Sequence, residues 1–263
     1  MTVLDVRAAA GLLHTREAGS GPLLLCLHGI GSSSASFGPQ LAAFADRMRV
    51  AAWDAPGYAA SPGLADPPGM DGYADLAAAL ITRLGYEEAV VLGVSFGGVI
   101  AARLAQRHPS LVRALVLGDS TRGSGRTPEQ AAAMRGRAAE LAERGAEAFA
   151  AVRARRLLRA DAPESEVSAA AAAMASAVRL PGYAHAAEAM AETDLDGTLA
   201  SIKAPTLVVY GEGDRVTGAR ESEAIAAQIP GAVLRVLPGA GHLANVENPA
   251  AFNAAVSDFL QAL

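Results

Sequence analysis

Short, uninterrupted apolar segments recur along the 263-residue chain, and helix-like segments separate them. Segments that are apolar at every position are typical of strands covered on both faces. Connections of helical length between them favour a mostly parallel sheet with right-handed crossovers. We expect strands at residues 23–27, 49–53, 89–92, 114–117, 206–210 and 233–237, and one or two antiparallel strands within the first twenty residues. Helices are expected at about residues 36–45, 72–84, 97–108, 221–228 and 249–260.

The alternation stops between about residues 121 and 199, where the chain is rich in alanine and has no strand-like segment. A helical insertion between two parallel strands is most simply a lid over their carboxyl ends, where such sheets bind ligands. The sequence therefore predicts an α/β protein with a doubly wound sheet. Its core comprises residues 1–120 and 200–263, and a helical cap at 121–199 is expected after the sixth strand.

Composition narrows the classes of partner. Charged residues make up 19% of the chain and hydrophobic residues 51%, which excludes a disordered chain. The net charge is −5 and no basic block occurs, so nucleic acid is excluded as an expected partner. No apolar run reaches about 18 residues, and the first nineteen residues lack a secretory apolar region. We therefore expect a cytoplasmic protein with no membrane partner and a small-molecule substrate; the oligomeric state does not follow from the sequence.

The strongest motif is Gly-Val-Ser-Phe-Gly-Gly at residues 93–98, between an expected strand and an expected helix. A chain that turns so sharply holds its serine in a strained conformation and leaves no room for side chains nearby. Gly93 and Gly97 fit that turn, Gly98 lets the helix lie close to the sheet, and Ser95 is the candidate nucleophile. The alternatives are a glycine-rich turn with an incidental serine or a phosphate loop, but the lysine of a phosphate loop is absent.

An acyl-transfer site also needs two backbone N–H groups that face the oxyanion. One is expected from Phe96, directly after the serine, and the other from Ile30 in the His-Gly-Ile-Gly loop after the first buried strand. That loop could also be an ordinary glycine-rich turn. We expect His28 to brace it, and Asp54 to order neighbouring loops without chemical involvement.

A serine nucleophile needs a general base and a group that orients the base. Among the five histidines, His242 follows the last expected strand, at the same sheet edge as Ser95. Asp214 follows the preceding strand, which gives the chain order serine, aspartate, histidine. Glu212 and Asp119 are alternative acids, and Asp119 could reach the histidine from the neighbouring strand.

Together these motifs, including Pro-Thr-Leu-Val-Val-Tyr-Gly-Glu-Gly-Asp at residues 205–214, resemble the α/β-hydrolase superfamily over nearly the whole chain. The carboxyl-terminal part is most similar to 3-oxoadipate enol-lactonases and related small esterases. The resemblance implies the α/β-hydrolase fold and hydrolysis with no metal or organic cofactor. Two features depart from the enol-lactonase pattern: the predicted lid lacks tryptophan, and Ala59 replaces the usual glycine.

The leading hypothesis is a serine hydrolase that cleaves a small ester or lactone through an acyl-enzyme. One alternative is a carbon–carbon bond hydrolase that acts on a diketone ring-cleavage product, and another is a ligand-binding protein without catalysis. Arginines of the predicted lid could bind a substrate carboxylate or form a solvated helix face. The arginines in question are Arg153, Arg155, Arg156 and Arg159.

Overall fold

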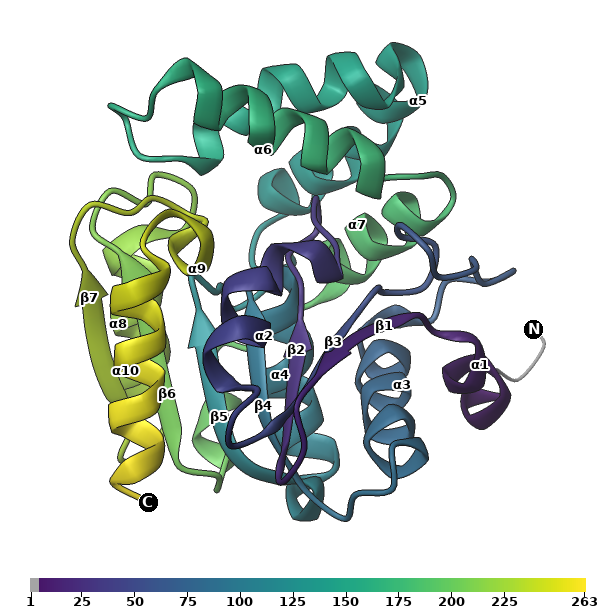
Figure 1. The fold of residues 1–263 in the computed structure, drawn as a ribbon. Helices are drawn as coiled ribbons and strands as arrows, with labels where there is room; N and C mark the ends of the chain where they lie inside the picture. Colours follow the sequence, from purple (N-terminus) through teal and green to yellow (C-terminus); the bar gives the residue numbers. More distant parts are fainter. Residues whose placement is uncertain (1–4) are drawn as a thin grey trace.

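A computed structural model describes residues 5–263 and shows a seven-stranded sheet with helices on both faces (Figure 1). The strand order is β1-β3-β2-β4-β5-β6-β7; β1 pairs antiparallel with β3, and every other pairing is parallel. The strands are β1 (Thr15–Ala18), β2 (Leu23–Leu27), β3 (Arg49–Trp53), β4 (Ala89–Val94), β5 (Val112–Gly118), β6 (Thr206–Gly211) and β7 (Val233–Leu237). The predicted α/β fold is confirmed.

The apolar runs become strands because helices exclude water from both faces of the sheet. In β2, Leu23, Leu25 and Leu27 pack into one layer of the core, whereas Leu24 and Cys26 pack into the other. The first layer also contains α1 (Val6–Leu12), α3 (Gly69–Arg83), α4 (Phe96–Arg107) and α8 (Gly218–Gln228). The second contains the short helix η1 (Ser34–Phe37), α2 (Gly38–Phe44) and α10 (Pro249–Gln261).

Three helices fill the chain between β5 and β6, and we call this segment the helical insertion: α5 (Pro128–Leu157), α6 (Glu164–Ala177) and α7 (Gly182–Glu192). Figure 1 shows α5 and α6 above the edge where the parallel strands end. Helix α5 is interrupted at Gly145, whose φ of 76° and ψ of 165° are not helical. The remaining short elements are η2 (Pro109–Leu111), η3 (Leu199–Ser201) and α9 (Ala244–Glu247).

The amino-terminal region contains one antiparallel strand, as expected, and also a helix that the sequence analysis did not predict. Residues 6–12 form helix α1, and β1 is the one strand before β2 in the described chain. Three consecutive alanines favour helix, and the Asp5 carboxylate accepts a hydrogen bond from the backbone N–H of Ala8 at 3.0 Å, which caps it. The helical insertion therefore follows the fifth strand of the described chain rather than the sixth.

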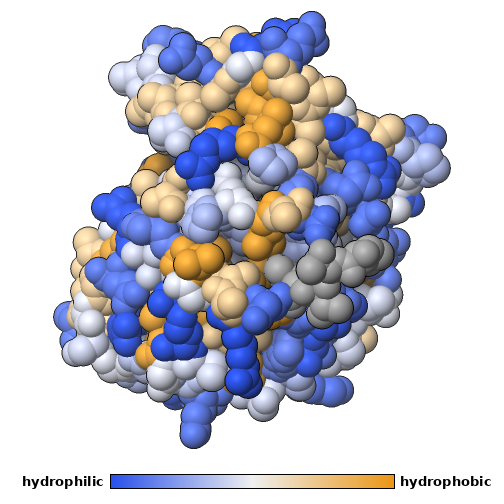
Figure 2. Space-filling model, turned by 90° about the vertical axis from the view of Figure 1, so that its right-hand side faces the viewer, coloured by the Kyte–Doolittle hydropathy of each residue, from blue (hydrophilic) through white to orange (hydrophobic). Residues whose placement is uncertain are grey.

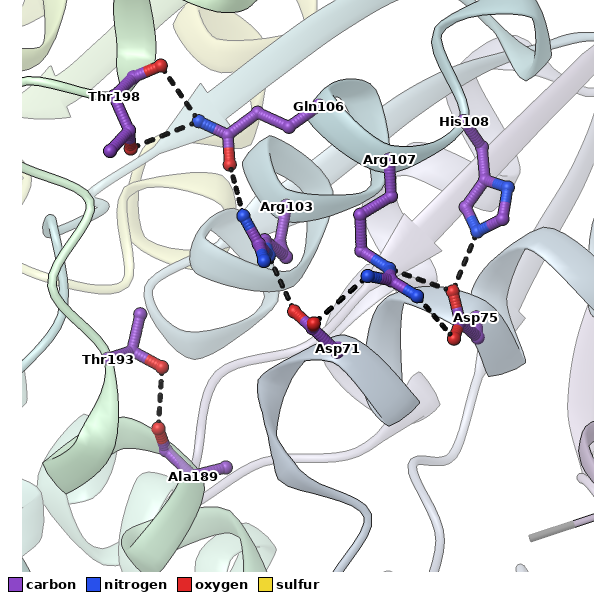
Figure 3. A network of polar contacts seen from close by, with 9 residues as sticks. All are labelled: Asp71, Asp75, Arg103, Gln106, Arg107, His108, Ala189, Thr193 and Thr198. Carbon is purple, nitrogen blue, oxygen red and sulfur yellow. Dashed lines mark hydrogen bonds and ion pairs between the residues drawn. The ribbon is translucent and has the colours of Figure 1, made fainter. Parts of the chain in front are cut away.

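Helix α4 is fixed to α3 by a network of charged side chains (Figure 3). Arg107 contacts both carboxylate oxygens of Asp75, at 2.9 and 2.8 Å, and Arg103 contacts Asp71 at 2.6 Å. His108, just past the end of α4, contacts Asp75 at 2.7 Å. Exposed pairs of this kind stabilise by only about 0–1 kcal/mol each, but this network orients the helix that begins directly after Ser95.

The outer surface is mixed in character. In Figure 2, hydrophobic residues form separate small groups among hydrophilic ones, including a group over the helical insertion at the top. Within residues 5–263, no helix combines the length and the apolarity needed to cross a membrane.

Candidate active site

Ser95 lies in the turn between β4 and α4 with φ 54° and ψ −115°, a conformation that L-amino acids rarely adopt. The neighbouring glycines explain how this turn fits. A Cβ on Gly93 would lie 2.1 Å from the carbonyl oxygen of Gly97, and a Cβ on Gly97 would lie 1.9 Å from that of Leu27. The expectation that side chains would clash here is confirmed, and at Gly97 the clash is with the end of β2.

We expect the Gly97→Ala substitution to destabilise the protein by at least about 3 kcal/mol, because a backbone carbonyl cannot move aside as a flexible side chain can. For a chain of this size, that corresponds to a fall in Tm of roughly 6–12 °C in thermal unfolding. Gly136→Ala is the matched control, since a Cβ at this helical position meets nothing within 4 Å. Equal Tm values for the two variants would show that the elbow tolerates the methyl group.

The structure brings together the three side chains that the sequence analysis selected. Nε2 of His242 lies 3.0 Å from Oγ of Ser95, and Nδ1 lies 3.0 Å from Oδ2 of Asp214. The side chains of His242 and Asp214 are 5% and 0% exposed. An ionised carboxylate can only accept, so Nδ1 carries the proton and Nε2 is free to accept from the serine hydroxyl.

Asp214 also makes hydrogen bonds with groups other than His242. Oδ2 of Asp214 accepts from the hydroxyl of Thr217 at 2.6 Å and from the N–H of Gly218 at 3.0 Å. Burial alone would raise the pKa of Asp214, but the hydrogen bonds from His242 and these donors hold it well below its usual range. Burial alone would lower the pKa of His242, yet the bond to Asp214 raises it above the ordinary value. The sequence analysis did not predict the contact between Thr217 and Asp214. The position of Thr217 three residues after the acid and just before α8 is the signal that could have indicated it.

Asp119, the alternative acid, is buried beside the site but makes other contacts. Its carboxyl oxygens accept from the N–H of Gly211 at 2.9 Å and from the N–H of Ala244 at 3.2 Å. Burial, together with the charge of Asp214, raises the pKa of Asp119 to about 8. Asp119 therefore links the end of β6 to the chain after His242 through hydrogen bonds, whereas Asp214 is the carboxylate that contacts the imidazole of His242.

The two expected oxyanion donors flank the serine. Phe96 is the first residue of α4, so its N–H has no acceptor within the helix. Ile30 lies in the turn after β2, and a Cβ on the adjacent Gly29 would be 3.4 Å from Cβ of Ser95. The loop after β2 thus approaches the serine closely enough to present a backbone N–H beside it.

His28 and Asp54 connect the loops behind the site, as expected. His28 is fully buried; its Nδ1 lies 2.8 Å from the carbonyl oxygen of Gly29, and its Nε2 accepts from the N–H of Ala55 at 3.0 Å. Burial lowers the pKa of His28, which favours the neutral ring. Asp54 accepts from the N–H of Ser34 at 2.7 Å, so it orders the loop after β2.

Comparison with known proteins identifies the family. Residues 22–249 match the family model described as alpha/beta hydrolase fold. The chain belongs to the α/β-hydrolase fold family. This hydrolase is 31% identical to 3-oxoadipate enol-lactonase 2 from Acinetobacter baylyi over 240 residues, which cover 89% of this chain and 87% of that protein. It is 32% identical to 2-hydroxymuconate semialdehyde hydrolase from a Pseudomonas strain, covering 97% and 93% of the two chains.

A solved structure agrees with this assignment. A thermophilic esterase from Thermogutta terrifontis, determined with malate bound, superposes with a TM-score of 0.87 at 28% identity and covers 95% of this chain and 93% of that one. The relatives carry names of different hydrolases, so the comparisons support hydrolysis as the reaction class without choosing the substrate.

The serine and histidine of the hydrolase open into a cavity of about 520 Å³, within the size range of small-molecule sites. Its wall includes the loop after β2, the end of α5, and α6. Four large apolar side chains of the helical insertion, Met134, Phe149, Met174 and Met190, are buried, and Met174 lines the cavity.

The arginines proposed from the sequence divide into two groups. Arg155 pairs with Glu164 and Arg159 with Glu166, whereas Arg153 and Arg156 line the cavity.

Arg137 also lines the cavity, and the sequence analysis missed it. It lies three residues after Met134 and four before Leu141, both buried, so it shares their face of α5. An arginine at helical spacing among buried apolar residues was the signal that could have found it.

The end of α5 is tied to the loop that carries the histidine. The N–H of His242 donates to the carbonyl oxygen of Leu157 at 2.8 Å, and the N–H of Arg159 donates to the Glu247 carboxylate at 2.9 Å. A Cβ on Gly241 would lie 2.5 Å from the nitrogen of Arg159, so the two segments are in close contact.

Among residues 5–263, no group of three or more histidine, cysteine, aspartate or glutamate side chains is arranged to hold a metal ion. The charged and catalytic-type groups that line the cavity include Ser95 and His242, two glutamates (Glu166 and Glu247) and three arginines (Arg137, Arg153 and Arg156).

Proposed function

We propose that the chain hydrolyses a small-molecule ester or lactone through an acyl-enzyme formed on Ser95. The observation that carries the proposal is the continuous contact from Ser95 Oγ to His242 Nε2 and from His242 Nδ1 to Asp214, at 3.0 Å each, in the wall of a cavity. An oriented base in contact with a strained, accessible serine is what nucleophilic catalysis requires.

The reaction divides into two steps. Nε2 of His242 accepts the hydroxyl proton as Oγ of Ser95 attacks the substrate carbonyl carbon, and Asp214 stabilises the resulting imidazolium. The N–H groups of Phe96 and Ile30 stabilise the oxyanion. The proton then passes to the leaving alkoxide, and a water molecule activated by His242 cleaves the acyl-enzyme and restores the serine.

A fluorophosphonate probe tests the nucleophile in the wild-type protein. We expect one covalent adduct, located on Ser95 by peptide mass spectrometry, together with turnover of p-nitrophenyl esters. Tight binding of small molecules without labelling or turnover would instead support the ligand-binding alternative and contradict the proposal.

A second candidate is carbon–carbon bond hydrolysis, favoured by the 32% identity to 2-hydroxymuconate semialdehyde hydrolase. A panel of simple esters, five-membered enol-lactones and vinylogous diketones separates the two reactions. The ester proposal expects higher kcat/KM for the first two classes, and a marked preference for the diketones would favour the second candidate.

We expect kcat/KM to fall as the pH drops through the pKa of His242, because the base must be neutral to accept the serine proton. Asp214 raises this pKa, so the midpoint of the acid limb should lie above the ordinary histidine value of about 6.5. The measurement uses p-nitrophenyl acetate, which does not titrate in this range, so that the midpoint reports the enzyme. A midpoint below the ordinary value would contradict the expectation, because burial would then outweigh the stabilisation of the imidazolium by Asp214.

A further inference from the structure

Most of the charges that line the cavity are already compensated. Glu166 and Glu247 both contact Arg159, at 2.7 and 3.3 Å. Arg153 contacts Glu140 and also lies over the ring of Phe149, 4.5 Å from its centroid. These groups need no ligand to balance their charge.

Two cationic side chains of the wall are not compensated. Within the described residues, no carboxylate oxygen lies within 4.0 Å of a guanidinium nitrogen of Arg137 or Arg156, although both line the cavity. Arg156 is exposed, whereas Arg137 is partly buried beside Tyr183. Burial, together with the charges of Arg153 and Arg156, lowers the pKa of Arg137, while the hydroxyl of Tyr183 acts in the opposite direction.

A guanidinium that is partly removed from water and has no counter-ion carries a free-energy penalty, which an anion bound beside it would offset. The planar fork of a guanidinium fits a carboxylate through two parallel hydrogen bonds. The rest of the wall is largely apolar, with Ile30, Met174, Leu243 and Val246 among its residues, and suits a short hydrocarbon chain. One cavity thus contains a nucleophile, an apolar stretch and a free cation.

We propose that Arg137 binds a carboxylate at the far end of the acyl group, so that the preferred substrates are esters or lactones of short dicarboxylic acids. This inference rests on the proposed function, because it takes Ser95 as the residue that receives the acyl group. Arg156 is exposed, also lines the cavity, and lies close enough for its charge to lower the pKa of Arg137, so it adds positive charge near the same site.

The test compares p-nitrophenyl half-esters of succinic, glutaric and adipic acids with the butanoate, pentanoate and hexanoate esters, matched in carbon number. The wild-type enzyme should prefer the half-ester at one length or more by at least about 10-fold in kcat/KM. Arg137→Met should reduce kcat/KM for that half-ester by about 10- to 100-fold, as expected for lost hydrogen bonds to a charged group, and for the neutral ester by less than about 3-fold.

Two further variants separate binding from folding. Arg135→Met removes an exposed arginine of the same helix that pairs with Glu188, and should change neither rate. Arg137→Lys keeps the charge but loses the fork, and should recover only part of the preference. No half-ester preference at any length, or an equal loss for both substrates in Arg137→Met, would overturn the inference.

Calorimetric titration with free succinate, glutarate and adipate gives a readout without turnover. The wild-type protein should bind at least one of them about 10-fold or more tightly than Arg137→Met does. Equal affinities would overturn the role of Arg137. Absence of fluorophosphonate labelling at Ser95 would instead overturn the proposed function, so the two failures are distinguishable.

Discussion

The Ser95→Ala variant should lose kcat on p-nitrophenyl esters by a factor on the order of 10⁶, the loss expected when the nucleophile of a triad is removed. The methyl group cannot form the acyl-enzyme, while the proposed backbone donors of Phe96 and Ile30 would remain and leave a small residual rate over water. Stopped-flow traces would measure kcat of the wild type, and long progress curves would measure the residual rate of the variant. Replacing a hydroxyl by hydrogen at this position should leave the fold intact, which circular dichroism would check.

Two controls define this prediction. Ser201→Ala removes an exposed hydroxyl on η3 and should leave kcat unchanged. The double variant Ser95→Ala/His242→Ala should be no slower than Ser95→Ala by more than about 10-fold, because the two residues act as a unit. Near-wild-type turnover by Ser95→Ala would remove the serine from the mechanism.

The Asp214→Asn variant should lose kcat by about 10⁴-fold, because an amide no longer fixes the proton on Nδ1 of His242. Its side-chain nitrogen can donate to Nδ1 and so move the ring proton to Nε2, where it faces Ser95 and blocks the base. The contacts with Thr217 and Gly218 would also lose the charged acceptor. Steady-state kinetics with p-nitrophenyl acetate measure the loss.

Asp119→Asn is the matched control for the acid. This carboxyl bonds to backbone N–H groups rather than to the imidazole, and its pKa of about 8 keeps it protonated at neutral pH. An amide keeps one of the two oxygen acceptors and places its NH2 group against the other N–H donor, so Tm should fall, while kcat should fall by less than about 10-fold because the contact with the imidazole is not involved. Thermal unfolding would show whether the variant remains folded. If Asp119→Asn lost more activity than Asp214→Asn, Asp119 would be the acid that orients the base.

The strands of the sheet could be predicted from the sequence because each one is a short continuous run of mostly apolar residues, which can be recognised without knowing the rest of the fold. Residues 206–210 are apolar at nearly every position, and the structure covers them on both faces. The sequence analysis did not predict the helix at residues 6–12, which an aspartate cap and an alanine run favour. The insertion was expected after the sixth strand and follows the fifth in the described residues, because one strand rather than two precedes β2.

Ser95, Asp214 and His242 were selected as candidates because chain order and strand-end position constrain which side chains can meet. What local pattern does not supply is the choice between Asp214 and Asp119, since both follow strands that lie next to each other. That choice depends on which carboxyl points to the ring, and hence on the packing of the loops. Arg137 escaped notice for a related reason: its charge matters only once the acidic partners of the other arginines are known.

The hydrogen bond from His242 to Leu157 has a consequence for altering substrate range by engineering. The end of α5 is hydrogen-bonded to the loop that carries His242, so changing residues 157–159 to enlarge the cavity would also move His242. A smaller side chain in place of Met174 would enlarge the cavity with less risk. Met174 lines the cavity from α6, and its backbone has no hydrogen bond to the loop that carries His242.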